Sequence, residues 1–346
     1  MATTWFVLIA VVWTLFFVLE GFDFGLGMLV PFLGHDDAER RALRETIGPV
    51  WDGNEVWLIV AAGSMFAAFP DWYATLFSAY YLPLFLVLVA LIARGTASEF
   101  RDERPGSRWR TNWDRLMVAG CLLAPLLIGV ALGGSLAGLP LDSDHEFTGG
   151  FLDLVPAYAL FMGLVLVVLC LFQGLLFVRL KLDGPVDERA GRAAMGVGAL
   201  MVALLVVYMV WTRLEAPGPG VIPGAGAWLA LTFAVAALWL AGHHGLRGWA
   251  FACSSLTIAF TLVGFFGELH PDLVVSSPAP ANSVTATAAA SSSYTLTLIT
   301  IIAGVMLPVV LLYTAWNYWV FRRRVTGPRT TPTTPPTTPT TASPTP

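Results

Sequence analysis

The sequence predicts an all-α membrane protein that crosses the bilayer nine times. Of its 346 residues, 56% are hydrophobic and 12% are charged, whereas a soluble chain carries about 25% charged residues. A span takes roughly 20 apolar residues, and nine runs qualify: 5–33, 53–70, 74–94, 115–138, 153–179, 192–213, 226–243, 248–268 and 295–321. Eight spans plus one suit two four-helix bundles with one peripheral helix, although hydropathy alone does not fix that arrangement.

The basic residues indicate the orientation of the spans. Of the 19 Lys and Arg residues, 18 fall in or beside alternate loops, and Arg213 is the exception. Arg94, at the end of the third run, is grouped with the loop that follows it. Because basic residues collect on the cytoplasmic side, we expect the N-terminus outside and the C-terminus in the cytoplasm.

The two ends of the chain differ. The first apolar run is too long for a signal peptide and has no basic region before it, so we expect a retained span. Residues 326–346 are almost all Thr and Pro, which cannot bury apolar surface, so we expect a disordered cytoplasmic tail. The membrane domain is therefore expected to cover residues 1–325.

Four carboxylates lie in or at the edge of the first two spans: Glu20, Asp23, Asp52 and Glu55. Charged groups in a membrane are costly, and by default they mark an ion or proton route or a buried contact. Glu20 and Asp23 are three residues apart, so they share a helix face in the inner half of the first span. They form either part of a proton path or a buried pair that only fixes packing.

Asp52 and Glu55 begin the second span just after Pro49. Their spacing resembles a capping box, in which Asp52 would accept backbone N–H bonds. A cap at the cytoplasmic rim is also a place where cytoplasmic protons could be taken up, so both roles stay open. Asn54, between them, is a candidate relay or hydrogen-bond partner.

By the span assignment, none of the five histidines lies at mid-membrane: His35, His145, His243, His244 and His270. A haem buried between spans needs axial His or Met ligands on facing helices. We therefore expect this chain to bind no haem and no other metal. It also lacks a phosphate-binding glycine loop, a nucleophile triad and a CxxC pair, so we assign it no catalytic residue.

Two early motifs, GFDFGLGML at 21–29 and GPVWDGNEVWL at 48–58, together resemble subunit II of the cytochrome bd-type quinol oxidases. Further similarities are RWRTNWD before the fourth span, PLLIGVALG within it, WAFACSSLT at the start of the eighth and PVVLLYTAWNYWVF at the end of the ninth. The resemblance covers about residues 1–325. The arginine-rich composition suits an actinobacterial member.

The resemblance implies a multi-pass protein of the bacterial plasma membrane with two four-helix bundles plus one helix. The family oxidises quinol at the outer side and reduces O2 to water with cytoplasmic protons, so turnover is electrogenic. Haem b and haem d belong to subunit I, the main partner. Further expected partners are small single-span accessory subunits and, as in some members, a bound quinone (menaquinone or ubiquinone). No nucleic acid is expected.

The resemblance also assigns roles to single residues. Asp23 and Asp52 match family residues in a proton route toward the haems. Trp57 matches a Trp near the oxygen-access route, and with Asn54 it is a candidate for that route or for the subunit interface. Glu20 stands where some members have Asp, which keeps the carboxylate. Glu55 stands where some have Gln, so not every member has an acid there.

Two other functions remain open on the residues alone. A proton-coupled transporter would also place acids in the membrane, but it typically shows broken helices in two related halves. Here the acids concentrate in the first two spans. The other alternative is a purely structural scaffold subunit.

Overall fold

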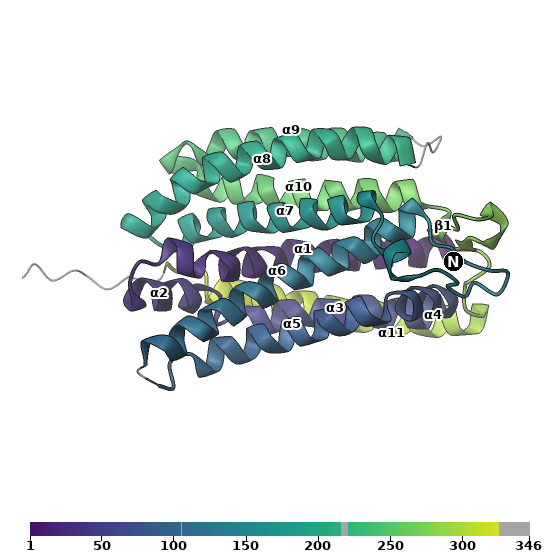
Figure 1. Ribbon diagram of the computed structural model, residues 1–346, viewed down its shortest axis with the longest axis horizontal. Coiled ribbons are helices and arrows are strands. Elements are labelled where there is room, and N and C mark those ends of the chain that lie inside the picture. The colour runs from purple at the N-terminus through teal and green to yellow at the C-terminus, as the bar shows by residue number, and fades with distance from the viewer. Residues whose placement is uncertain (105, 216–220, 325–346) are drawn as a thin grey trace, which may run out of the picture.

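The computed structural model describes residues 1–104, 106–215 and 221–324, most of which are helical (Figure 1). The long helices are α1 (Ala2–Leu33), α3 (Trp51–Ala68), α5 (Tyr81–Phe100), α6 (Ser107–Ala137), α7 (Ala157–Lys181), α8 (Pro185–Glu215), α9 (Val221–Ala241), α10 (Arg247–Leu269) and α11 (Ser293–Val320). The shorter elements are α2 (Asp37–Ile47), α4 (Pro70–Ala79), β1 (Asp272–Val274) and β2 (Val284–Thr285), with 3-10 turns at Phe151–Leu154, His244–Leu246 and Pro280–Asn282. The expected disordered tail lies outside the described residues.

Eight helices of the described chain are long and apolar enough to cross a membrane: α1 and α5 to α11. They confirm the all-α, multi-pass class. α3, which the sequence predicts as a span, is not among the eight, and its first five residues include Asp52, Asn54 and Glu55. The count of nine spans and their orientation therefore stay predictions.

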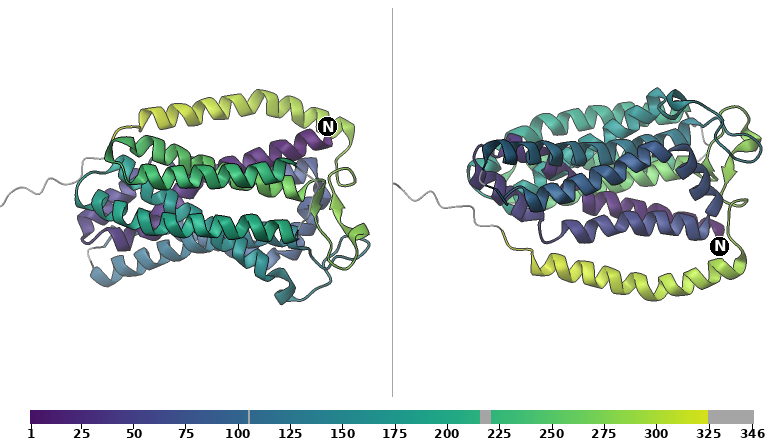
Figure 2. Two further views of the ribbon diagram at one scale, coloured as in Figure 1. Left: turned by 90° about the horizontal axis from the view of Figure 1, so that it is seen from above. Right: turned by 60° about the horizontal axis from the view of Figure 1, so that its bottom comes forward.

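The long helices pack as two groups with one helix outside (Figures 1 and 2). α7 to α10 form one group, and α1, α3, α5 and α6 form the other. α1 lies at the centre, where it contacts α3, α6, α7 and α10. α11 runs along the outside, packs mainly on α3 and leaves nearly all its length exposed. This arrangement agrees with two four-helix bundles and a peripheral helix.

Glycines let α1 and α7 cross in close contact. A Cβ added at Gly25 would lie 1.9 Å from the carbonyl oxygen of Cys170, and one at Gly174 would lie 2.6 Å from the backbone of Gly25. Only residues without a side chain permit this approach, as small-residue pairs do in other membrane helices. The contact fixes the rotation of α1, and with it the direction in which Glu20 and Asp23 point.

Two segments differ from the predicted spans. The run 74–94 is divided between α4 and α5, with a break at Tyr80. The loop after the first span holds a helix that the apolar pattern does not reveal, α2, which buries Leu43 and Ile47 beneath a charged face. Asp36 caps α2, because its side chain accepts a hydrogen bond from the Glu39 amide at 2.7 Å.

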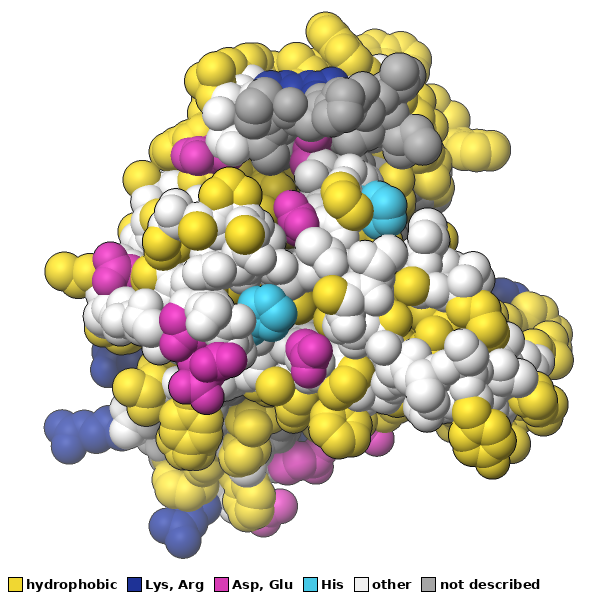
Figure 3. Space-filling model, turned by 90° about the vertical axis from the view of Figure 1, so that its right-hand side faces the viewer, with side chains coloured by type: hydrophobic (Ala, Val, Ile, Leu, Met, Phe, Trp, Pro, Cys, Tyr) yellow, Lys and Arg dark blue, Asp and Glu magenta, His cyan; other side chains and the backbone are white. Residues whose placement is uncertain are grey.

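The two ends of the molecule differ in charge. Acidic and histidine side chains gather on the face at the N-terminal end, which Figure 3 shows directly. At the opposite end, arginines join neighbouring elements. Arg101, at the end of α5, donates hydrogen bonds to Asp114 of α6 at 2.5 Å and to Asp37 of α2 at 2.9 Å. Arg189 of α8 donates to Glu39 of α2 at 2.5 Å. These bonds fasten α2 across the basic end.

Candidate functional site

Glu20 and Asp23 lie in the second half of α1, and neither side chain is exposed at all. Three residues apart, they share one face of the helix. The carboxyl oxygens Glu20 Oε2 and Asp23 Oδ1 are buried and accept no hydrogen bond from the described residues. Two acids thus lie inside the helix bundle with part of their hydrogen-bonding capacity unused.

Arg94 of α5 provides the positive charge beside these acids. Its guanidinium donates to Glu20 of α1 and, at 2.9 Å, to Glu55 Oε2 of α3. The Arg94 side chain is 4% exposed, and its guanidinium lies 5.0 Å from the Phe24 ring centre and 5.4 Å from that of Trp51. One buried cation therefore joins two carboxylates from two other helices, because the planar guanidinium presents several N–H donors in fixed directions.

Arg94 corrects one part of the sequence interpretation, which grouped it with a cytoplasmic basic loop. α5 continues past it to Phe100 and turns the guanidinium into the bundle. The sequence does contain a signal that Arg94 belongs to the span. Arg94 directly follows an unbroken apolar run, and the helix continues through the next residues, Gly95, Thr96 and Ala97. The proximity of the run to a basic loop concealed it.

Asn54 links the acids to the peripheral helix. Its Nδ2 donates to Asp23 Oδ2 at 2.7 Å and to the Leu19 carbonyl at 3.0 Å. Its Oδ1 accepts a hydrogen bond from the Tyr318 hydroxyl of α11 at 2.9 Å. The Asn54 side chain is 1% exposed, and these bonds use its two donors and its acceptor. We call the set Glu20, Asp23, Asn54, Glu55, Arg94 and Tyr318 the acid cluster.

Asp52 stands apart from the acid cluster. It lies in the first turn of α3 and is exposed. The helix is capped at Val50 with no side-chain hydrogen bond, so the capping-box interpretation of Asp52 and Glu55 is wrong. Glu55, one turn further along, is 22% exposed and reaches Arg94. Asp52 is therefore exposed at the start of α3, whereas the side chain of Glu55 points inward to Arg94.

Trp57 completes the sequence-derived set. It is 1% exposed and lies on the same buried face of α3 as Asn54. Its place in oxygen access or at a subunit interface stays a prediction. Tyr318, by contrast, lies in the motif PVVLLYTAWNYWVF, and nothing in the apolar pattern of α11 distinguishes it from the exposed Tyr313.

None of the histidines whose side chains are described lies in the middle of a long helix. The histidines whose side chains are described, His35, His145, His243 and His270, lie at helix ends or in loops. Within the same part of the chain, no group of three or more His, Cys, Asp or Glu side chains is placed to hold a metal ion.

Charge pairing at the basic end lowers the pKa of two carboxylates outside the spans. The hydrogen bond from Arg101 holds the pKa of Asp37 below its usual range, with Arg110 as a second donor. The hydrogen bond from Arg189 does the same for the pKa of Glu39. Both acids belong to α2, so the ionised forms of these carboxylates keep that helix against α5, α6 and α8.

Known proteins match this chain along nearly its whole length. A sequence profile described as "Cytochrome bd terminal oxidase subunit II" matches residues 1–321. "Cytochrome bd ubiquinol oxidase subunit 2" of Bacillus subtilis (strain 168) is 39% identical over 330 residues, which cover 93% of this chain and 96% of that protein. "Cytochrome bd-I ubiquinol oxidase subunit 2" of Escherichia coli (strain K12) is 34% identical over 357 residues, covering 93% and 94%.

A solved structure of bd oxidase from Geobacillus thermodenitrificans supports the fold. It covers 92% of this chain and 96% of the matched chain, with a TM-score of 0.67 at 9% sequence identity. The sequence matches span nearly the whole of this chain and of its relatives. The chain therefore belongs to the cytochrome bd terminal oxidase subunit II family.

Proposed function

We propose that this chain is subunit II of a quinol:O2 oxidoreductase in a bacterial plasma membrane and that its acid cluster passes protons toward haems held by subunit I. The named relatives are subunits of ubiquinol oxidases, and the described histidines do not fit a haem site. The chain's own contribution to oxygen reduction is then to bind, hold and release protons.

The observation that carries this proposal is the charge composition of the acid cluster. Glu20, Asp23 and Glu55 contribute three carboxyl groups, and Arg94 contributes one guanidinium. Burying a charge without a partner costs several kcal/mol, so a site with more carboxylates than cations is stabilised when protons bind to it. Such a site can accept a proton from one side and yield it to another.

The placement of Asp52 supports a route in two stages. Asp52 is exposed at the start of α3, and Glu55 lies one turn further along the same helix. A proton taken up at Asp52 would pass to the partly exposed Glu55, whose carboxylate lies on Arg94. Arg94 also binds Glu20, so the carboxyl groups of Glu55 and Glu20 contact the same guanidinium.

The experiment that tests this proposal starts from the assembled complex. A tagged copy of this chain should co-purify with a haem-bearing partner, and the complex should consume O2 when supplied with quinol. Asp52→Asn should slow O2 consumption severalfold at unchanged haem content, while Asp144→Asn, in an exposed loop at the other end, should not. Unchanged O2 consumption in Asp52→Asn would contradict the uptake role. A chain that purifies without pigment would contradict the subunit role itself.

Family membership favours the oxidase over a proton-coupled transporter. A transporter typically uses broken helices at matching positions in two halves. In this chain the carboxylates of the cluster come from α1 and α3 alone, and α1 is helical without interruption from Ala2 to Leu33. A purely structural role would leave O2 consumption unaltered when the acids are neutralised.

A further inference from the structure

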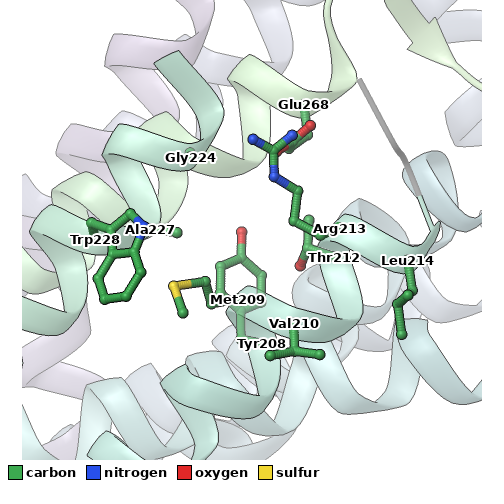
Figure 4. A pocket seen from close by; sticks show the side chains of 11 residues that line it. Tyr208, Met209, Val210, Thr212, Arg213, Leu214, Gly224, Ala227, Trp228 and Glu268 are labelled. Atoms are coloured by element: carbon green, nitrogen blue, oxygen red, sulfur yellow. The ribbon is translucent and has the colours of Figure 1, made fainter. Parts of the chain in front are cut away.

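A second site lies in the other helix group, at the N-terminal end of the molecule. A cavity of about 360 Å³ opens between the end of α8, the start of α9 and the end of α10 (Figure 4). Its lining includes Tyr208, Met209, Arg213, Trp228 and Glu268. No residue of the acid cluster lines it, so it is separate from the site described above.

One buried acid and one partly exposed cation stand side by side in this cavity. Arg213 Nη1 lies 3.2 Å from Glu268 Oε1. The Arg213 side chain is 40% exposed, whereas that of Glu268 is 4% exposed. Glu268 Oε2 is buried and accepts no hydrogen bond from the described residues. A ligand in the cavity would thus meet a positive group near the opening and a carboxylate oxygen in need of a donor deeper inside.

The remaining wall includes apolar side chains that are exposed on the outside of the helix group. Val210 of α8 and Trp228 of α9 line the cavity and are 54% and 61% exposed. Tryptophan is enriched where membrane proteins meet the headgroup layer, because its ring is apolar and its N–H is polar. A lipid could therefore reach the cavity from the bilayer with its acyl chains against these residues.

We propose that this cavity binds the phosphoethanolamine headgroup of a zwitterionic phospholipid. The phosphate would lie on the Arg213 guanidinium, which binds phosphate oxygens well. The ammonium group would donate to Glu268 Oε2. This order of charges distinguishes headgroups, because a phosphoglycerol head has no cation for Glu268 and a choline head has no N–H to donate.

The purified complex in detergent gives a direct test by native mass spectrometry. We expect phosphatidylethanolamine to be retained about tenfold more than phosphatidylglycerol or phosphatidylcholine with the same acyl chains. Glu268→Gln should abolish the preference for ethanolamine over choline. Arg213→Gln should reduce retention of all three lipids. Glu215→Gln, at the same end of α8 but outside the cavity lining, is the matched control and should behave like the wild type.

Two further measurements separate the alternatives. Trp228→Ala changes an exposed side chain, so it should weaken retention of every lipid without altering the headgroup preference, even if Glu268→Gln assembles poorly. Soluble phosphoethanolamine at the same concentration should bind far less than the lipid, because it lacks the apolar part. Equal retention of the three lipids would show that Arg213 and Glu268 only join α8 to α10, and equal binding of the soluble head would exclude a lipid as the natural source.

Discussion

Arg94 of α5 donates a hydrogen bond to Glu20 of α1 in the interior of the helix bundle. The same guanidinium binds Glu55 of α3, so one side chain connects the three helices that surround the buried acids. Removing Arg94 leaves both Glu20 and Glu55 without their cation, whereas removing one of these acids leaves Arg94 paired with the other. A buried charge without a partner costs more than a neutral cavity of the same shape. This asymmetry makes Arg94 the most informative position to change.

Arg94→Met should reduce quinol-driven O2 consumption by about tenfold or more, since Glu20 and Glu55 lose the positive charge that they share. Arg94→Lys should retain part of the activity, because an ammonium group cannot bind two carboxylates in a fixed planar fork. O2 consumption is normalised to haem absorbance, which separates activity from assembly. Arg108→Met, at an exposed position at the start of α6, is the control. Full activity in Arg94→Met would mean that the cation only serves packing.

Tyr318→Phe should loosen the attachment of α11. The hydroxyl donates to Asn54 Oδ1, and α11 has few other contacts with the rest of the chain. Loss of one such bond costs about 1 kcal/mol, so the melting temperature of the complex should fall by a few degrees. Tyr313→Phe, on the same helix but 61% exposed, should leave the melting temperature unchanged. Equal shifts in the two variants would argue against the link.

Gly25→Ala should destabilise the chain because the new methyl group would meet the Cys170 carbonyl at 1.9 Å. Overpacking of this kind costs about 1–3 kcal/mol, and it would also rotate or displace the helix that carries Glu20 and Asp23. Thermal unfolding should show the loss. At Gly63 of α3 an added Cβ has nothing within 4 Å, so Gly63→Ala should be neutral or slightly stabilising. A harmless Gly25→Ala would mean that α1 and α7 can separate freely.

Acid should release α2 from the basic end. The pKa values of Asp37 and Glu39 are lowered by hydrogen bonds from Arg101 and Arg189. A carboxylate whose folded pKa is lowered stabilises the fold above its unfolded pKa, and the contribution disappears as the pH falls through the folded value. The attachment should therefore hold from pH 7 to 5 and weaken below about pH 4.

A fluorophore attached through Arg41→Cys, at an exposed position of α2, reports this release as a drop in anisotropy. The native cysteines Cys121 and Cys170 are buried and Cys253 is replaced by Ala to avoid background labelling. Adding Asp37→Asn should make the anisotropy at pH 7 resemble that at low pH. An anisotropy that stays constant across the whole range would contradict the pairing.

The fold was largely predictable because lipid imposes a simple rule on sequence. Long apolar runs must be helices, and eight of the nine predicted runs appear as described helices that meet the criteria for a span. α2 was missed because it is charged on one face and short, which gives no signal in a search for apolar runs. The break at Tyr80 was missed because both sides of it are apolar.

The acid cluster was predictable only in part. Carboxylates in an apolar run stand out, so the free-energy cost of a charged group in a membrane is enough to predict Glu20 and Asp23 as site residues. Their partners come from distant parts of the sequence, with Arg94 74 residues from Glu20 and Tyr318 264 residues from Asn54. Only the folded chain brings Arg94 of α5 and Tyr318 of α11 to the side chains of α1 and α3, and no local pattern encodes this.

The most direct test of the proton route is the rate of proton uptake by the complex in vesicles after a pulse of O2, measured with a pH-sensitive dye. Asp23→Asn suits this test because the amide oxygen can still accept the hydrogen bond from Asn54 Nδ2, which spans 2.7 Å in the native chain. The acid cluster should therefore keep its packing but lose a proton acceptor. We predict that proton uptake is at least about tenfold slower than in the wild type, which corresponds to an activation free energy higher by about 1.4 kcal/mol. Uptake in Asp144→Asn should be unaffected. Uptake in Asp23→Asn as fast as in the wild type would contradict the account.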